Sequence, residues 1–416
     1  MDFFNYDHGV LRCEEVDLRE IAATAGTPCY VYSLRTLLRH AEVIDGAWRS
    51  FDHLTCYSVK ANSTLAILSV LASRGLGADV VSGGELFRAR RAGFPAERIV
   101  YSGVGKTIDE MRYALREGIL CFNVESESEL AALARVAEDQ HRRAPVALRI
   151  NPDVDPKTHP KVATGLRTSK FGIPHARAVE LYRRAAAMDR LDVIGIDAHI
   201  GSNLASVKPF VDSARRLVDL VASIRAEGIA LRMIDIGGGL GIRYNAETPP
   251  SPAEWSTAVG EVLAGAGLRI ITEPGRSMVG NVGVLLTKVL YLKQNGEKNF
   301  VVVDAGMNDL VRPSFYDSFH RILPAVERDA PEMVADVVGP ICESGDFLAR
   351  DRAIVRPEEG DILAVMSAGA YGFAMSSTYN SRPRAAEVLV AGDRWQAIRD
   401  RETYEDLVRG ERAFTG

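Results

Sequence analysis

The most informative side chains of this sequence stand just past short apolar runs. Lys60 follows one run, His199 a second and Glu273 a third, while three consecutive glycines follow a fourth. A lysine amine can attach a carbonyl compound, a carboxylate can pair with a protonated ring nitrogen, and glycine N–H groups can bind an anion. The residues at the ends of all such runs are Lys60, Ser82, Ser102, Gly103, Asn123, Arg149, His199, Gly237, Gly238, Gly239 and Glu273.

These runs have strand length, and amphipathic stretches of helical length separate them. Eight strand–helix units predict a closed (β/α)8 barrel, in which the residues after each strand meet at one rim. A lysine, a histidine, a glutamate and a glycine-rich turn at that rim predict a site for pyridoxal phosphate, with Lys60 as the Schiff-base lysine. The eight expected strands are 55–59, 77–81, 98–101, 119–123, 146–150, 192–198, 231–236 and 268–272.

The rest of the chain has a different pattern, because its β-rich runs lack regular helices between them. We therefore expect a (β/α)8 barrel over residues 27–275 and a β-barrel domain formed by 1–26 and 276–416. The segment 151–174 is rich in turn residues and predicts a long loop, either a lid or an inert excursion. The β-rich runs are 282–294, 299–304, 334–338, 361–366, 386–391 and 395–399.

Composition narrows the possible ligands and compartments. The 416 residues carry a net charge of −5 with scattered basic residues, which argues against nucleic acid and favours a small-molecule ligand. The five cysteines are odd in number and lack a C-x-x-C pair, so we expect a reducing cytosol. The first residues lack a signal-peptide pattern and no apolar run reaches about 18 residues, which predicts a cytoplasmic protein without a membrane segment. No histidine pair has metal-binding spacing, so no metal is expected.

Each of these residues, taken alone, also has an ordinary structural explanation. Lys60 fits a solvated lysine, His199 a satisfied core histidine, and the three glycines a tight turn. Glu273 and Arg276 fit an internal ion pair. The glycine spacing matches neither a dinucleotide fingerprint nor a P-loop, so a nucleotide cofactor is not expected.

Seven motifs occur in order along the chain. They are Tyr57-x-x-Lys60-Ala-Asn, Asp79-Val-Val-Ser-Gly-Gly-Glu85-Leu, His199-Ile-Gly-Ser, Gly237-Gly-Gly, Glu273-Pro-Gly-Arg276, Cys342-Glu343-Ser-Gly-Asp346 and Gly369-Ala-Tyr371. From about Thr27 to about Val390 this order resembles the fold-type III pyridoxal phosphate decarboxylases, and among them the diaminopimelate decarboxylase family. The resemblance implies an alanine-racemase-like barrel, a C-terminal β barrel, and a head-to-tail homodimer with two active sites at its interface.

The resemblance also implies roles for the matched residues. Lys60 would be the imine lysine, His199 the ring-stacking residue and Glu273 the pyridinium partner, while Cys342 would donate a proton from the partner subunit. The other implied cofactor contacts are Ser202, Gly237, Gly238, Gly239, Gly275, Arg276 and Tyr371, with Asp79 and Arg149 as secondary ring-side positions. The implied substrate contacts are Arg276, Arg312, Tyr316, Glu343 and Tyr371. Asn203 departs from the family, which usually has glutamine there.

The activity that the resemblance implies is decarboxylation of meso-2,6-diaminopimelate to L-lysine and carbon dioxide, the last step of lysine synthesis. The alternatives are a decarboxylase of ornithine, lysine or arginine, a racemase, and a non-catalytic decarboxylase-like binding protein. Arg312 and Tyr316 favour a substrate with a distal carboxylate. Cys342 stands where a racemase would place a tyrosine. The retention of Lys60, Glu273 and Cys342 together disfavours a non-catalytic protein.

Overall fold

The structure is a computed structural model that describes residues 2–154 and 170–414. Most of the loop expected at 151–174 therefore lies outside the described residues. Two compact units are distinguished by their internal contacts. We call residues 40–243 and 247–278 the barrel unit, and residues 1–39, 244–246 and 279–416 the β unit.

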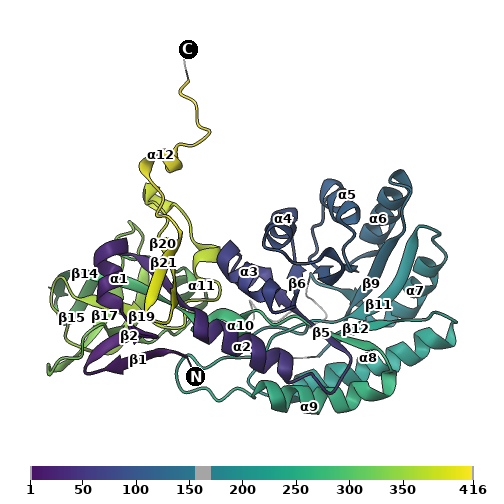
Figure 1. The fold of residues 1–416 in the computed structure, drawn as a ribbon, viewed down its shortest axis with the longest axis horizontal. Coiled ribbons are helices and arrows are strands. Elements are labelled where there is room, and N and C mark those ends of the chain that lie inside the picture. The colour runs from purple at the N-terminus through teal and green to yellow at the C-terminus, as the bar shows by residue number, and fades with distance from the viewer. Residues whose placement is uncertain (1, 155–169, 415–416) are drawn as a thin grey trace. The chain divides into compact units, whose positions relative to one another are not determined.

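The barrel unit is built on a closed ring of eight parallel strands. Figure 1 shows strands of this unit with helices on the outside. Each strand pairs with its neighbours in the order β9-β11-β12-β13-β5-β6-β7-β8, and a β8–β9 pairing closes the ring, so the eight-stranded prediction is confirmed. A short strand, β10 (Ile173–Pro174), adds to β9. The ring strands are β5 (His53–Ser58), β6 (Gly77–Val80), β7 (Ile99–Tyr101), β8 (Cys121–Val124), β9 (Ala144–Asn151), β11 (Leu191–Asp197), β12 (Met233–Asp235) and β13 (Arg269–Thr272).

Helices follow the strands, and side-chain caps mark where several of them begin. The hydroxyl of Ser82 accepts the Glu85 N–H at the start of α4, and Thr107 and Ser251 form capping boxes at the starts of α5 and α9. Ser82 lies close after the end of β6, whereas a longer connection separates Ser251 from the end of β12. The helices are α2 (Leu34–Gly46), α3 (Leu65–Ser73), α4 (Gly83–Arg91), α5 (Ile108–Glu117), α6 (Glu127–Asp139), α7 (Ala178–Ala186), α8 (Lys208–Ala226), α9 (Pro252–Leu263) and α10 (Arg276–Val279).

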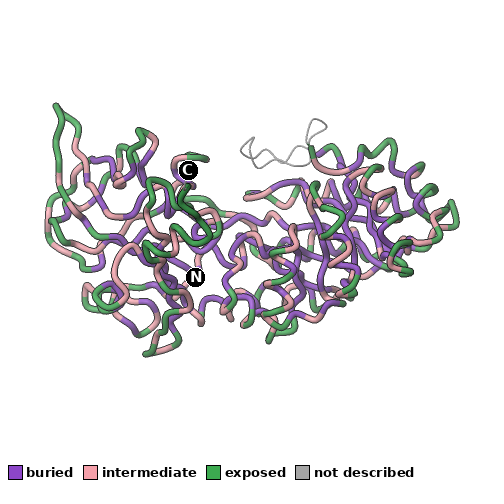
Figure 2. Tube along the Cα trace, turned by 90° about the horizontal axis from the view of Figure 1, so that it is seen from above, coloured by how far each residue is buried: buried purple, intermediate pink, exposed green. Residues whose placement is uncertain are grey.

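Apolar side chains fill part of the barrel interior, and the strands are buried along most of their length (Figure 2). Leu54 and Cys56 of β5 belong to this interior cluster. Alternate residues of a strand point to the same face, so Ser58 continues that face at the carboxyl end of β5. The carboxyl-end rim is therefore where polar side chains replace the apolar filling. The other members of the cluster are Val100, Cys121, Ala147, Ile194, Met233 and Ile271.

The β unit contains a nine-stranded sheet and a small three-stranded sheet, β1-β2-β3. In the larger sheet β14 pairs with β4, β15 and β19, and all six β-rich runs expected after the barrel form strands. Strand β18 was not expected, because the charged residues at 350–352 interrupt its apolar pattern. The β-unit elements are β1 (Phe4–Asp7), β2 (Val10–Cys13), β3 (Val16–Asp17), α1 (Leu18–Ala25), β4 (Cys29–Ser33), β14 (Gly283–Asn295), β15 (Lys298–Val303), α11 (Arg312–Tyr316), β16 (Ile322–Pro324), β17 (Glu332–Val338), β18 (Phe347–Val355), β19 (Ile362–Val365), β20 (Ala386–Ala391), β21 (Arg394–Arg399) and α12 (Tyr404–Leu407).

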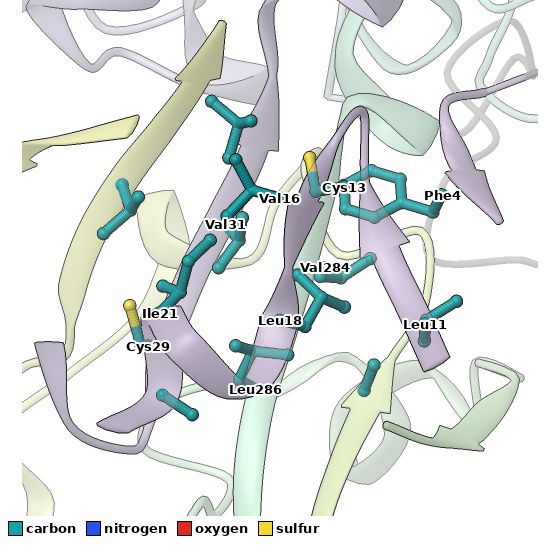
Figure 3. Close-up of a cluster of buried hydrophobic side chains, with 14 of the residues drawn as sticks. Phe4, Leu11, Cys13, Val16, Leu18, Ile21, Cys29, Val31, Val284 and Leu286 are labelled. Atoms are coloured by element: carbon teal, nitrogen blue, oxygen red, sulfur yellow. The ribbon is translucent and has the colours of Figure 1, made fainter. Parts of the chain in front are cut away.

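The N-terminal segment packs into the core of the β unit (Figure 3). Leu11 and Leu18 share a buried cluster with Val284 and Leu286 of β14. Strand β4 pairs with β14 and with β20, so its residues lie in the larger sheet of this unit. The contacts therefore divide the chain after residue 39, whereas the sequence pattern suggested a division after residue 26. Across the described ranges, no helix is both long and apolar enough to cross a membrane.

The close packing of β6 predicts that even one methyl group would destabilise the barrel. A Cβ at Gly77 would lie 2.4 Å from the backbone oxygen of Arg98 and 2.7 Å from Cys56 Sγ. We expect Gly77→Ala to lower the free energy of unfolding by about 1–3 kcal/mol, because backbone must move. Gly265→Ala is the control, since a Cβ there meets nothing within 4 Å. Urea denaturation measures both, and equal stability of the two variants would contradict the packing argument.

Candidate active site

Lys60 lies directly after β5, in a short 3-10 turn over Val59–Ala61. Its Nζ donates to Asp79 Oδ2 at 3.0 Å, and 35% of the Lys60 side chain is exposed while that of Asp79 is fully buried. The Ser58 hydroxyl lies 2.8 Å from the same Asp79 oxygen and 3.0 Å from the backbone oxygen of Glu273. The amine is thus accessible to a ligand and held by a buried acid.

Glu273 follows β13 and presents a buried carboxyl group to the rim. Ser102 Oγ donates to its Oε1 at 3.2 Å, and its backbone N–H donates to Gly237 O at 2.8 Å. Burial, with the nearby negative charges of Asp235 and Asp79, raises the pKa of Glu273 well above its usual range. The ionised form therefore needs a cation beside it, and a protonated ring nitrogen is a cation of suitable size.

The three glycines after β12 form a turn that has no room for side chains. A Cβ at Gly238 would lie 2.1 Å from Glu273 O, and one at Gly239 would lie 2.2 Å from Gly201 O. Gly237 and Gly239 also have φ values of 64° and 111°, which glycine tolerates best. The Gly237 N–H donates to Asp235 Oδ1 at 2.9 Å, and the Gly238 N–H donates to His199 Nδ1 at 3.1 Å. Two of these N–H groups thus have partners inside the protein.

His199 follows β11 and accepts the Gly238 N–H through Nδ1, so that nitrogen carries no proton. Burial away from water, together with the positive charges of Arg149 and Lys60, lowers the pKa of His199 well below its usual value. The imidazole is therefore neutral near pH 7. A neutral planar ring is suited to stacking on an aromatic ligand, as the resemblance implied.

Arg276 begins α10 directly after the Glu273 motif. Its Nη2 donates to Ser202 Oγ at 3.2 Å, so the side chains from the His199 and Glu273 motifs meet. The guanidinium is largely buried, and the backbone oxygen of Gly275 accepts the Met278 N–H at 3.0 Å. A guanidinium, a hydroxyl and a glycine turn form a donor set that suits a phosphate or a carboxylate.

Three acidic residues that the sequence analysis did not single out, Glu125, Asp197 and Asp235, lie near Arg149 or the glycine turn. Arg149 donates through Nη1 to Glu125 Oε1 at 2.8 Å, and its Nε lies 3.9 Å from Asp197 Oδ2. Burial raises the pKa of Asp197 well above its usual range, and burial with the charge of Asp197 raises that of Asp235 to about 8. The sequence signal that could have identified Asp197 and Asp235 is an acidic residue at the end of an apolar strand, because a buried carboxylate needs a compensating partner.

In the β unit, Arg312 is a buried residue of α11 with several partners. Its Nε donates to His320 Nε2 at 3.4 Å and its Nη2 to Ser318 Oγ at 3.2 Å. The guanidinium carbon also lies 5.4 Å from the ring centre of Tyr244 and 5.9 Å from that of Tyr316. These contacts restrain the arginine fork and bring the expected pair Arg312 and Tyr316 together.

Cys342 and Glu343 lie in an exposed turn between β17 and β18. The Cys342 N–H donates to Asn380 Oδ1 at 2.7 Å. Asp346 anchors the turn, because its two carboxylate oxygens accept the N–H groups of Met307 and Ile341 at 2.6 and 2.7 Å. The thiol of Cys342 is therefore presented on a fixed backbone. Tyr371, in the next motif, has a φ of 56°, so its backbone is in the left-handed region.

The neutral state of His199 predicts a pH dependence of stability. The folded-state pKa is lowered, so the unfolded chain gains a proton below about pH 6.5 that the folded chain does not bind. We expect His199 to lower the free energy of unfolding by up to about 1.4 kcal/mol per pH unit as the pH falls.

His199→Gln keeps a hydrogen-bond acceptor but cannot be protonated, so it serves as the matched variant. Urea denaturation of the ligand-free protein from about pH 7.5 to about pH 5.5 measures the difference. The variant should gain stability relative to the parent as the pH falls. Parallel pH profiles would mean that His199 is not held neutral.

Comparisons with known proteins agree with the resemblance carried by the motifs. The family model for the pyridoxal-binding domain of pyridoxal-dependent decarboxylases matches residues 34–280. The chain is 51% identical to diaminopimelate decarboxylase of Pseudomonas aeruginosa over 411 residues, 99% of each chain. It is 50% identical to that of Vibrio cholerae over 409 residues, 98% of each. The crystal structure of diaminopimelate decarboxylase from M. jannaschii in co-complex with L-lysine has a TM-score of 0.95 and 36% identity, and the match covers 99% of this chain and 98% of that one. The chain belongs to the diaminopimelate decarboxylase family of pyridoxal-dependent decarboxylases.

Proposed function

We propose that this protein uses pyridoxal phosphate to decarboxylate meso-2,6-diaminopimelate, forming L-lysine and carbon dioxide. The observation that carries the proposal is the grouping of an accessible Lys60 amine, the buried Glu273 carboxyl and a side-chain-free glycine turn at one barrel rim. The names of the bacterial relatives and the L-lysine bound in the M. jannaschii structure support the choice of substrate and product. All five cysteines are free, in keeping with a cytoplasmic enzyme.

The residues at the rim fit the cofactor. Lys60 would hold it covalently, Glu273 would face the ring nitrogen, and His199 would stack on the ring. The N–H groups of Gly237 and Gly238 are engaged within the protein, so we assign the Gly239 N–H to the phosphate. Ser202, Gly275, Arg276 and Tyr371 complete the proposed phosphate side. When bound, pyridoxal phosphate supplies an electron sink for the pair left by the departing carboxylate.

Asp79 and Glu273 would control charge on the two sides of this site. Asp79 accepts from Lys60 Nζ and holds the free amine as an ammonium group near the rim. The raised pKa of Glu273 means that a cation at the ring position would stabilise its ionised form, in addition to the charges of Lys60 and Arg149 and the Ser102 hydrogen bond. Preorganised dipoles and charges that stabilise the charge developing in the transition state are among the largest contributions to catalysis. Glu273 therefore favours a charged ring nitrogen, which strengthens the electron sink.

The substrate has a carboxylate and an ammonium group at its distal end. Arg276, Arg312 and Tyr316 would bind carboxylate, and Glu343 would bind the ammonium group, while Tyr371 would line the same site. The contacts of Arg312 with Ser318 and His320 hold its fork before substrate binds. A substrate without the distal carboxylate would lose the ion pair with this guanidinium, which disfavours ornithine, lysine and arginine.

Cys342 is the proposed proton donor, and we propose that Cys342 and Glu343 act in the site of the partner subunit of a homodimer. The thiol is exposed on its own chain, and Asn380 and Asp346 hold the turn that carries it. An exposed side chain on an ordered turn is suited to enter a neighbouring subunit. Its proton would be delivered to the carbon that loses carbon dioxide.

The first test is to remove the proposed covalent attachment. We expect Lys60→Ala to lose both decarboxylation and covalently bound cofactor, because no other residue replaces the amine. Lys288→Ala, on an exposed position of β14, is the control and should behave like the parent. Carbon dioxide release is assayed with meso-diaminopimelate, L-lysine and L-ornithine in parallel. Undiminished turnover by Lys60→Ala, or a preference for L-ornithine, would contradict the proposal.

The second test concerns the shared site. If Cys342 acts across the dimer, Lys60→Ala and Cys342→Ala should each be nearly inactive but complement each other when their subunits mix. Each heterodimer then contains one site with both substitutions and one site with neither. Random exchange makes about half of the dimers heterodimers, so activity should recover to roughly a quarter of the parent.

The two variants are co-expressed with different affinity tags. The whole mixture should show roughly a quarter of the parental activity, whereas purified doubly tagged dimers, each with one intact site of two, should show roughly half. Lys60→Ala mixed with Lys60→Ala carrying the second tag is the control and should remain inactive. Doubly tagged dimers of Lys60→Ala and Cys342→Ala that also remain inactive would assign Cys342 to the site of its own chain or exclude it from the site.

A further inference from the structure

A chain of buried hydrogen bonds crosses the carboxyl ends of four barrel strands. Asn123 of β8 donates through Nδ2 to Ser102 Oγ at 3.2 Å and to Asp235 Oδ2 at 3.3 Å. Ser102, after β7, donates to Glu273 Oε1 at 3.2 Å. Asp235, at the end of β12, accepts the Gly237 N–H at 2.9 Å. None of the four side chains is more than 5% exposed, so water does not replace these bonds.

The chemistry of Asn123 sets the direction of this chain. An amide nitrogen has two N–H groups and no acceptor, so one N–H goes to Ser102 Oγ and the other to Asp235 Oδ2. Since the Ser102 oxygen accepts from Asn123, its single proton is free to point at Glu273 Oε1. Oε1 is thereby used as an acceptor. When Glu273 is protonated, its proton is favoured on Oε2, because Oε1 accepts from Ser102.

The same chain connects Glu273 to the glycine turn. Asp235 accepts from Asn123 with one oxygen and from the Gly237 N–H with the other. Asn123 is thus connected through Ser102 to Glu273 and through Asp235 to the Gly237 turn, and the Glu273 N–H also contacts that turn directly at Gly237 O. A change at Asn123 would disturb both groups together.

Lys106 fixes the backbone on which this chain depends. Its Nζ donates to Gly103 O and to Asn123 O, each at 2.8 Å, and to Glu129 Oε1 at 2.7 Å. Its side chain is only 1% exposed, so the ammonium group is enclosed with its partners. The backbone beside Ser102 and at Asn123 is therefore restrained by one cation.

We propose that Ser102 and Asn123 are positioning residues that keep Glu273 Oε1 as a hydrogen-bond acceptor and leave Oε2 to exchange a proton with a ring nitrogen. The proposal rests on the proposed function, because it requires the cofactor ring beside Glu273. The Ser102 hydrogen bond stabilises the ionised carboxylate that remains once the proton is on the ring. Without that bond, Glu273 would compete more strongly for the proton.

The experiment uses pyridoxal phosphate labelled with 15N at the ring nitrogen and bound to the complete protein. The NMR shift of that nitrogen reports its protonation independently of turnover. For Ser102→Ala we expect a shift toward the neutral ring and a loss of kcat of about 10- to 100-fold, the size expected for one hydrogen bond to a charged group. KM should change far less than kcat, because the substrate contacts remain.

Two matched variants separate positioning from packing. Ser102→Thr keeps the hydroxyl and should retain the parental shift. Ser256→Ala removes another buried hydroxyl, one that donates to Ala253 O within α9, and should leave shift and kcat unchanged.

Asn123→Ala removes the donor that orients Ser102, so the nitrogen shift should move in the same direction as in Ser102→Ala. If Ser102→Ala does not fold, Asn123→Ala by itself tests the positioning role of the Ser102 hydroxyl.

The outcomes distinguish this inference from the proposed function. A parent that binds no cofactor, or whose ring nitrogen is as neutral as in Glu273→Gln, would contradict the role proposed for Glu273 itself. A protonated ring in the parent with no change in Ser102→Ala and Asn123→Ala would overturn only the positioning role. An equal change in Ser256→Ala would also overturn it, because the effect would then reflect packing alone.

Discussion

The burial of several carboxyl groups at one end of a barrel is the constraint on which the rest of this site depends. Asp79, Asp197, Asp235 and Glu273 are all nearly inaccessible to water. Ionised carboxylates in such surroundings are costly unless cations or hydrogen-bond donors compensate them. Arg149 pairs with Glu125 and lies near Asp197, and hydrogen bonds from side chains and backbone N–H groups compensate much of the rest. The raised pKa values show that the compensation is incomplete without a further cation.

This constraint explains why the polar groups are arranged as a connected set. Asp79 holds Lys60, and Asp235 holds the Gly237 turn, so each acid positions a group that can meet a ligand. A fully satisfied buried network is rigid, whereas a partly satisfied one is destabilising. The apolar cluster fills the barrel interior next to these polar groups. The glycine turn lets the backbone lie close to neighbouring backbone atoms, where a side chain would collide. The same contacts therefore contribute to the stability of the protein and to ligand binding.

The β unit meets a different requirement, since the residues that we propose to act on the substrate lie in turns and a short helix. Arg312 is restrained by Ser318, His320 and two tyrosine rings, and the Cys342 turn is restrained by Asp346. Arg312 donates to the neutral acceptors Ser318 and His320, whereas Asp346 accepts backbone N–H groups. Binding groups that are ordered in advance lose less conformational entropy when a ligand arrives. The sheet, anchored on the long strand β14, supplies the rigid support for both.

The sequence alone determined the eight-stranded barrel, because strand-length apolar runs and helical periodicity are local properties of the chain. It also predicted Lys60, His199 and Glu273 as candidate site residues, since a polar residue at the end of a buried strand is conspicuous. Only the tertiary structure showed that Ser102, Asn123 and Asp235 form one hydrogen-bonded chain, because its members come from separate strands whose register and closure no local pattern specifies. Strand β18 and the placement of β4 were likewise decided by pairing partners distant in sequence. The direction of each hydrogen bond, the burial of each side chain and the balance of charges arise from such long-range contacts. They can therefore be determined only from the folded structure.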